Sequence, residues 1–169
     1  SPAPIIGAVA TTAALLSGAM WAWRERPVQQ AVALAAVPVA VAAWVAMTDS
    51  TLAVGISLWL VGAVLFALGV RLRTPQPWIT ESVGAVALVA GGIQIATAIE
   101  GAGTFAVFVT GVGLLAFALV RGLAPSFVGQ LIAGVLGVIT VLQSLPPLVG
   151  WYAEQAGVVT GLTLWLGGV

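Results

Sequence analysis

Long apolar runs, interrupted by short breaks, make up most of this chain, and charged side chains fall almost entirely in the breaks. Of the 169 residues, 61% are hydrophobic and only 6% are charged, which is too few to cover the surface of a soluble globule. In a membrane, a helix of about 20 apolar residues crosses the ~30 Å hydrocarbon core. We therefore expect an all-α fold, a polytopic transmembrane helical bundle.

The breaks divide the chain into seven predicted spans. They cover residues 5–23, 28–47, 52–70, 78–99, 104–120, 126–143 and 147–168. Prolines mark the starts of most later spans, since the first turn of a helix tolerates proline. These prolines are Pro27, Pro75, Pro77, Pro125 and Pro147. Beginning the last span at Pro147 also puts Trp151 and Tyr152 near the interface, which aromatic side chains prefer.

The spans also indicate an internal repeat. Arginine, a short gap, proline and a new helix follow one another three times, at Arg24, Arg71 and Arg121. The segment 51–72 resembles 104–123, and 82–95 resembles 127–140, with Gly84 aligned to Gly129 and Gly92 to Gly137. This predicts parallel helical-hairpin repeats of about 50 residues. Chance similarity among helices rich in Ala, Val, Leu and Gly is the alternative.

The predicted domain organisation follows from these hairpins. The units cover 5–47, 52–99 and 104–143, the final span 147–168 stands alone, and together they form one transmembrane domain, 1–169. Because the sequence does not start with Met and one span has no partner, we expect it to be part of a longer chain.

Arginine positions predict the topology. All five arginines lie in the breaks after the first, third and fifth spans, whereas the breaks between them carry only acids, Asp49 and Glu100. By the positive-inside rule, the arginine-bearing loops are cytoplasmic and the N-terminus is outside. Abundant Ala, Val and Gly without Lys suggest a GC-rich prokaryotic genome. The expected location is the plasma membrane of a bacterium or archaeon.

Small residues at helical spacing predict where the helices pack, because helices in lipid approach most closely where side chains are small. The third span has a seven-residue seam, the sixth has small residues four apart, and the seventh has a pair four apart. These predicted packing residues are Gly55, Gly62 and Gly69, then Gly129, Ala133 and Gly137, then Gly157 and Gly161. Such faces serve packing within the chain or contacts between copies.

The residue types that carry most enzyme chemistry are missing. There is no Cys, His or Lys, so zinc sites on N or S ligands, His-ligated haem, thiolate chemistry and Schiff-base cofactors are excluded. The serines therefore have no base to activate them. We expect no catalytic, cofactor-binding or metal-binding residues, no enzyme activity and, at zero net charge, no nucleic-acid partner.

Neutral polar residues within the spans are the remaining candidates for a lined path or for hydrogen bonds between helices. They are Gln94, Thr97, Thr110, Gln130 and Thr140. Gln94 should find partners inside the bundle, because an unpaired amide in hydrocarbon is costly. Glu81 is expected to cap the fourth span and to pair with Arg71 and Arg73. A catalytic or coupling role for Glu81 is the alternative.

At the level of motifs, the parallel hairpins and phrases such as VGAVALVAGGIQIATAI resemble the small multi-pass bacterial membrane proteins of the HdeD type. The resemblance covers residues 51–143 and rests on apolar residues and glycines. That group usually has six spans, and the resemblance implies a non-enzymatic plasma-membrane bundle without supplying site residues.

Two functions fit these observations. The first is a non-enzymatic membrane domain that anchors or organises partners, which would be other membrane subunits or further copies of the chain within the lipid bilayer. The incomplete ends and odd number of spans motivate it. The second is a small permease or channel for a neutral or lipid-like solute, with Gln94, Thr97 and Thr110 lining the path. A polar cavity reaching the middle of the bilayer would favour the second.

Overall fold

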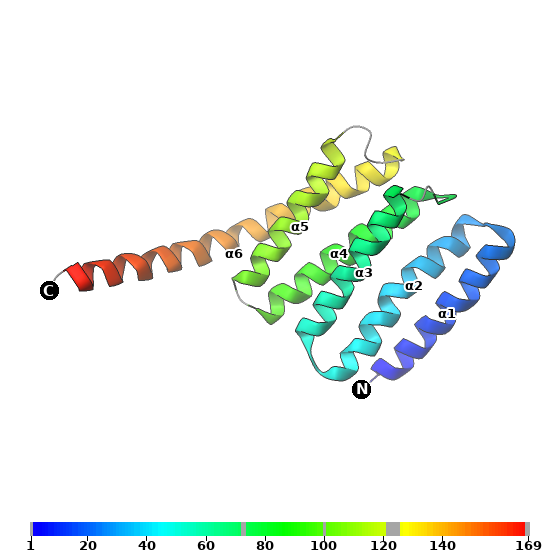
Figure 1. Cartoon of the computed structure of the whole chain (residues 1–169), viewed down its shortest axis with the longest axis horizontal. Coiled ribbons are helices and arrows are strands. Elements are labelled where there is room, and N and C mark those ends of the chain that lie inside the picture. Colours follow the sequence, from blue (N-terminus) through cyan, green and yellow to red (C-terminus); the bar gives the residue numbers. More distant parts are fainter. Residues whose placement is uncertain (1, 72–73, 100, 121–125, 168–169) are drawn as a thin grey trace.

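Six α-helices form the part of the chain that the computed structural model describes, which is residues 2–71, 74–99, 101–120 and 126–167 (Figure 1). They are α1 (Ala3–Arg24), α2 (Pro27–Val45), α3 (Thr51–Arg71), α4 (Pro77–Ala98), α5 (Ala102–Leu119) and α6 (Phe127–Gly167), with a 3-10 turn η1 (Ala46–Thr48) after α2. Each contains a stretch long and apolar enough to cross a membrane. The predicted all-α fold, with several helices apolar enough to span a membrane, is therefore confirmed.

Consecutive helices run antiparallel and form three hairpins side by side, α1–α2, α3–α4 and α5–α6 (Figure 1). We call the end where α1, α3 and α5 finish the arginine end, because Arg24, Arg26 and Arg71 lie there, and the opposite end the acidic end, after Asp49. Arg73, Glu100, Arg121 and Pro125 lie outside the described residues. In the apolar stretch of α4 that could span a membrane, half of the residues are buried, against 11% in the corresponding stretch of α1. Helix α4 is therefore the central helix.

Glycines let α3 and α4 pack backbone to backbone along their whole length. A Cβ atom added to Gly62 would lie 2.5 Å from the backbone nitrogen of Leu88, and one on Gly55 would lie 2.8 Å from that of Ile95. At Gly69 the nearest atom is the backbone nitrogen of Glu81, at 2.8 Å. These distances are too short for any side chain, so the seven-residue seam of α3 faces α4 throughout.

The hairpin α5–α6 crosses at a similar pair of glycines. A Cβ atom on Gly137 would approach the carbonyl oxygen of Gly111 to 2.9 Å, and Ala133 is fully buried in the core beside α4 and α5. Gly129, in contrast, faces Glu81 of α4, whereas Gly84 faces α3. The two glycines that the repeat aligns therefore make different kinds of contact.

The last two predicted spans form one helix in the structure. The sequence predicted spans at 126–143 and 147–168 with a break between them, but α6 continues through Pro146 and Pro147 over 41 residues. Each proline removes a helical N–H donor and favours a kink, but helices in membranes tolerate such losses. The helices apolar enough to span therefore number six in the described chain, where seven were predicted.

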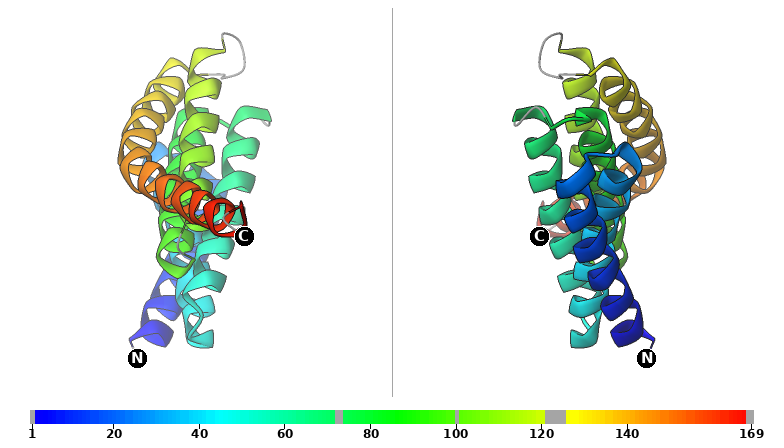
Figure 2. Two further views of the ribbon diagram at one scale, coloured as in Figure 1. Left: turned by 90° about the vertical axis from the view of Figure 1, so that its left-hand side faces the viewer. Right: turned by 90° about the vertical axis from the view of Figure 1, so that its right-hand side faces the viewer.

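Beyond the bundle, the described side chains of α6 are mostly exposed. Trp151 packs on Gly101, at the α4–α5 connection, and α6 then leaves the other helices (Figure 1) and is inclined to them in both side views (Figure 2). A Cβ atom added to Gly157 would meet nothing within 4 Å, so this predicted packing residue has no packing partner. The surroundings of Gly161 lie outside the described side chains.

Candidate functional site

The five neutral polar candidates are spread over the bundle and do not share one site. Thr110 is buried, where its hydroxyl donates to the Ala106 carbonyl at 2.8 Å and accepts from the Trp59 indole at 3.0 Å. Thr140 is buried and donates to Leu136 of its own helix at 2.6 Å. Both hydroxyls are thereby satisfied within the fold, as is usual for threonines in membrane helices.

The other three candidates lie near the helix ends. Thr97 is exposed and donates to the carbonyl of Gln94 at 2.8 Å. Gln94 borders a shallow hollow of about 380 Å³ at the acidic end, together with Asp49 and Ser50. Gln130 lies at the arginine end, with its amide 3.5 Å from the Val120 carbonyl. The position of Gln94 in the sequence suggested the middle of the bundle. In the structure it lies near the acidic end instead.

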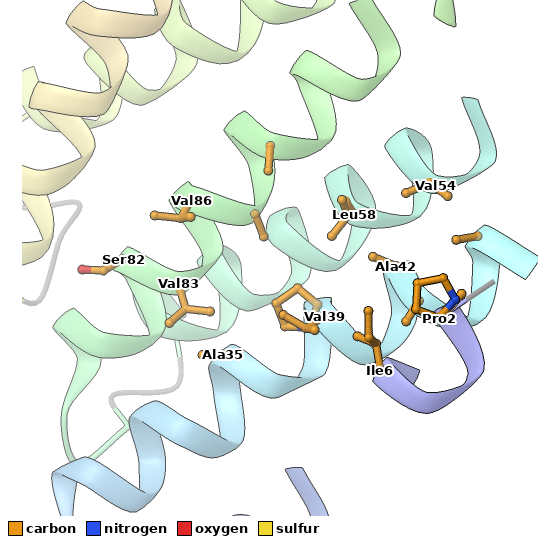
Figure 3. A pocket seen from close by; sticks show the side chains of 16 residues that line it. Pro2, Ile6, Ala35, Val39, Ala42, Val54, Leu58, Ser82, Val83 and Val86 are labelled. Carbon is orange, nitrogen blue, oxygen red and sulfur yellow. The ribbon is translucent and has the colours of Figure 1, made fainter. Parts of the chain in front are cut away.

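An apolar cleft of about 760 Å³ separates the first hairpin from the second (Figure 3). Small and aliphatic side chains of α1, α2, α3 and α4 line it, among them Ala42, Leu58 and Val86, and Pro38 of α2 adds a ring. Ser82 is the one polar side chain in its lining, and its hydroxyl donates to the Trp78 carbonyl at 2.6 Å. Among the described lining residues, the cleft therefore offers a solute no polar side chain apart from this hydroxyl.

A buried polar cluster at the arginine end is the most unusual feature of the structure. Its first part joins the first two hairpins: Gln30, on α2, is fully buried and donates through Nε2 to the Gln76 carbonyl and to the Thr80 hydroxyl, each at 3.2 Å. The Thr80 hydroxyl also lies 3.2 Å from that of Thr74. Hydrogen bonds thus tie α2 to the start of α4.

The second part of the cluster joins the second and third hairpins through Glu81. Its side chain is fully buried, and its Oε2 accepts a hydrogen bond from the Ser126 hydroxyl at 3.0 Å. Ser126 in turn accepts from the backbone N–H of Gly129 at 3.0 Å, so it caps α6. The sequence had suggested that Glu81 caps its own helix. In the structure it supports the start of α6 instead.

Two acceptor atoms in this cluster have no partner among the described residues, Gln30 Oε1 and Glu81 Oε1. Arg71, a predicted partner of Glu81, is exposed at the end of α3, and Arg73 lies outside the described residues. A buried carboxylate oxygen without a donor is costly, so this atom is suited to bind a cation or a hydrogen-bond donor.

Gln30, Thr80 and Ser126 were not predicted from the sequence to belong to a site. Each lies near the first turn of a span, where polar residues are ordinary. Only the packing of three hairpins brings Ser126 to Glu81, and Gln30 to Thr80. Their common position beside the arginine-bearing breaks is the one signal in the sequence that could have grouped them.

Comparison with known proteins gives no match to a family model, to a curated protein or to a solved structure. The resemblance to the HdeD type therefore rests on the sequence alone.

Proposed function

We propose that this chain is a non-enzymatic integral membrane domain that anchors or organises partners, either as part of a larger chain or as a subunit of a membrane complex. The observation that carries the proposal is the exposed segment of α6 that follows Leu148. From Val149 to Gly157, every described residue except Trp151 is exposed, and the surface includes Val149 at 63% and Tyr152 at 56% exposure.

The length of α6 adds to this argument. Its 41 residues correspond to ~60 Å, about twice the hydrocarbon thickness of a bilayer. The portion from Ser126 to Trp151 already covers the length of the bundle, because it starts at the arginine end and reaches Gly101 at the acidic end. A helix that extends beyond the bundle with exposed side chains is marginally stable alone, so another surface is needed to hold it.

The finer predictions belong to the same proposal. The arginine end faces the cytoplasm of a prokaryotic cell, which puts the N-terminus outside, and the hairpins derive from a repeated unit. The recurrence of arginine, a short gap and proline after Arg24, Arg71 and Arg121 supports the repeat. The distribution of arginine supports the orientation.

A permease is the weaker alternative on this geometry. Its proposed lining residues lie apart: Thr110 is hydrogen-bonded in the core, whereas Gln94 and Thr97 lie near the acidic end. The large cleft has an apolar lining and offers no hydrogen bonds to a polar solute. A neutral polar solute would therefore lose its hydration without compensation, whereas the apolar lining suits a lipid-like solute.

The mass of the particle extracted from membranes tests the proposed function. The protein is purified in a mild detergent from its native membrane at low expression, and light scattering with detergent correction gives the protein mass. We expect a particle larger than one chain, containing further copies or other membrane subunits. Shortening the chain after Trp151 should release the partners and leave the bundle folded. A monomer without associated subunits, in several detergents and in nanodiscs, would contradict the proposal.

A further inference from the structure

Half of the Glu81 carboxylate is left without a hydrogen bond inside the protein. Oε2 is bound by Ser126, but Oε1 has no partner in the described chain although the side chain is fully buried. An ionised carboxylate has about four acceptor sites. Several of them are therefore free to bind another group.

Two glycines form the walls around this carboxylate. A Cβ atom on Gly129 of α6 would overlap Oε2, and one on Gly69 of α3 would lie 2.9 Å from the Cγ atom of Glu81. The carboxylate therefore sits between the backbones of α3 and α6, with no side chain of either glycine to screen it. The side chain of any other residue at these two positions would occupy the space around the carboxylate.

The backbone at Gly69 is itself rich in acceptors. Helix α3 ends at Arg71, so the carbonyl oxygens of its last turn have no partner within the helix and carry the negative end of the helix dipole. Gly69 belongs to this turn, and a Cβ atom there would lie 2.8 Å from the backbone nitrogen of Glu81. An ionised carboxylate and a helix C-terminus repel each other unless a positive charge lies between them or the carboxyl group is protonated.

We propose that Glu81 binds a monovalent metal cation through Oε1, together with carbonyl oxygens of the last turn of α3. Carboxylate and helix-end carbonyl oxygens are the ligands that hold Na⁺ in membrane proteins. Ser126 is a positioning residue, because its hydrogen bond to Oε2 fixes the carboxylate and leaves Oε1 for the ion.

The charge of the site favours a monovalent ion. One carboxylate balances one positive charge, whereas Ca²⁺ sites usually contain several carboxylates. No group of three or more Asp, Glu, His or Cys residues occurs in the part of the chain that was described. This site does not depend on the proposed anchoring function, since the ion would link α3, α4 and the start of α6 within one chain.

Thermal unfolding of the purified protein in detergent tests the site, with Na⁺ as the probe. The unfolding midpoint is compared in NaCl and in choline chloride at equal ionic strength. Wild-type protein should be stabilised by NaCl by about 3–6 °C at tenfold saturation. Glu81→Gln should lose this difference. The matched control Glu25→Gln, at an exposed glutamate of the same end, should keep it.

Direct binding covers the case in which Glu81→Gln does not fold. Equilibrium dialysis with radioactive Na⁺ should show one ion per wild-type chain, and Ser126→Ala should weaken its affinity about tenfold. Equal midpoints in NaCl and choline chloride, combined with no bound Na⁺, would overturn the proposal. So would Na⁺ binding that is unchanged in a folded Glu81→Gln protein. Stabilisation by acidification alone would show that a proton occupies the position, and would also overturn it.

Discussion

Replacing Gly62 by alanine adds a single methyl group at the place where α3 and α4 are closest. The new Cβ atom would lie 2.5 Å from the backbone nitrogen of Leu88 and 2.9 Å from the carbonyl oxygen of Gly84. Both are backbone atoms of a helix and cannot rotate away, so the helices must separate. Reaching an ordinary contact of 3.4 Å requires a shift of about 0.9 Å at this point.

That shift sets the expected magnitude. A gap of 0.5 to 1 Å removes about a quarter to a half of the dispersion energy of the facing atoms, and overpacking of this kind typically costs ~1 to 3 kcal/mol. Gly62→Leu should cost at least as much. Leu60→Ala should cost less, because Leu60 is 53% exposed on the other face of α3.

Gly113→Ala is the matched control for Gly62→Ala. A Cβ atom on Gly113, within α5, would meet nothing within 4 Å, so alanine there should be neutral or stabilising by up to ~1 kcal/mol through helix propensity. Thermal or denaturant unfolding in one detergent measures both variants. If Gly62→Ala were as stable as Gly113→Ala, the close packing of α3 on α4 would be wrong.

Three further predictions concern the ends of the bundle. Gly101→Ala should lower stability by more than ~1 kcal/mol in the same unfolding assay, because Gly101 has φ +69° and an indole ring covers it; an unchanged midpoint would argue against that contact. Gln30→Leu should lower the free energy of unfolding by ~1 to 3 kcal/mol, because two hydrogen bonds are lost. Gln94→Leu should lower it by less than ~1 kcal/mol, because this amide only borders a hollow. The reverse order would refute the assignment of the buried cluster. In intact cells, a cysteine replacing Glu25 should resist an impermeant thiol reagent and one replacing Asp49 should react, and the opposite pattern would invert the orientation.

The positions of the helices were largely predictable because local residues fix them. The predicted spans 52–70 and 78–99 differ by a residue at each end from α3 (Thr51–Arg71) and α4 (Pro77–Ala98). Arginine and proline mark these boundaries, since both act on the nearest helical turn. At Pro147 the same signal failed, because a proline suits the first turn of a helix and is also tolerated inside a membrane helix.

The buried cluster was not predictable, because its members meet only through tertiary packing. Gln30 and Thr80 are 50 residues apart, and Glu81 and Ser126 are 45 apart. The hydrophobic pattern shows that these segments are helical, but nearly every face of a membrane helix is apolar, so the pattern cannot show which faces meet. For the same reason Gln94 was expected in the interior, although packing leaves it beside a hollow at the acidic end.

Crosslinking in native membranes tests most directly whether the exposed segment of α6 after Leu148 is an interaction surface. A photoreactive amino acid is introduced at Tyr152, which is 56% exposed, and in a separate variant at Leu114, which is 3% exposed in the core. Irradiation should crosslink the Tyr152 variant to a second polypeptide of defined mass. In the Leu114 variant it should give only crosslinks within the same chain. Exclusive labelling of lipid from position 152, in membranes that contain the complete native protein, would contradict it.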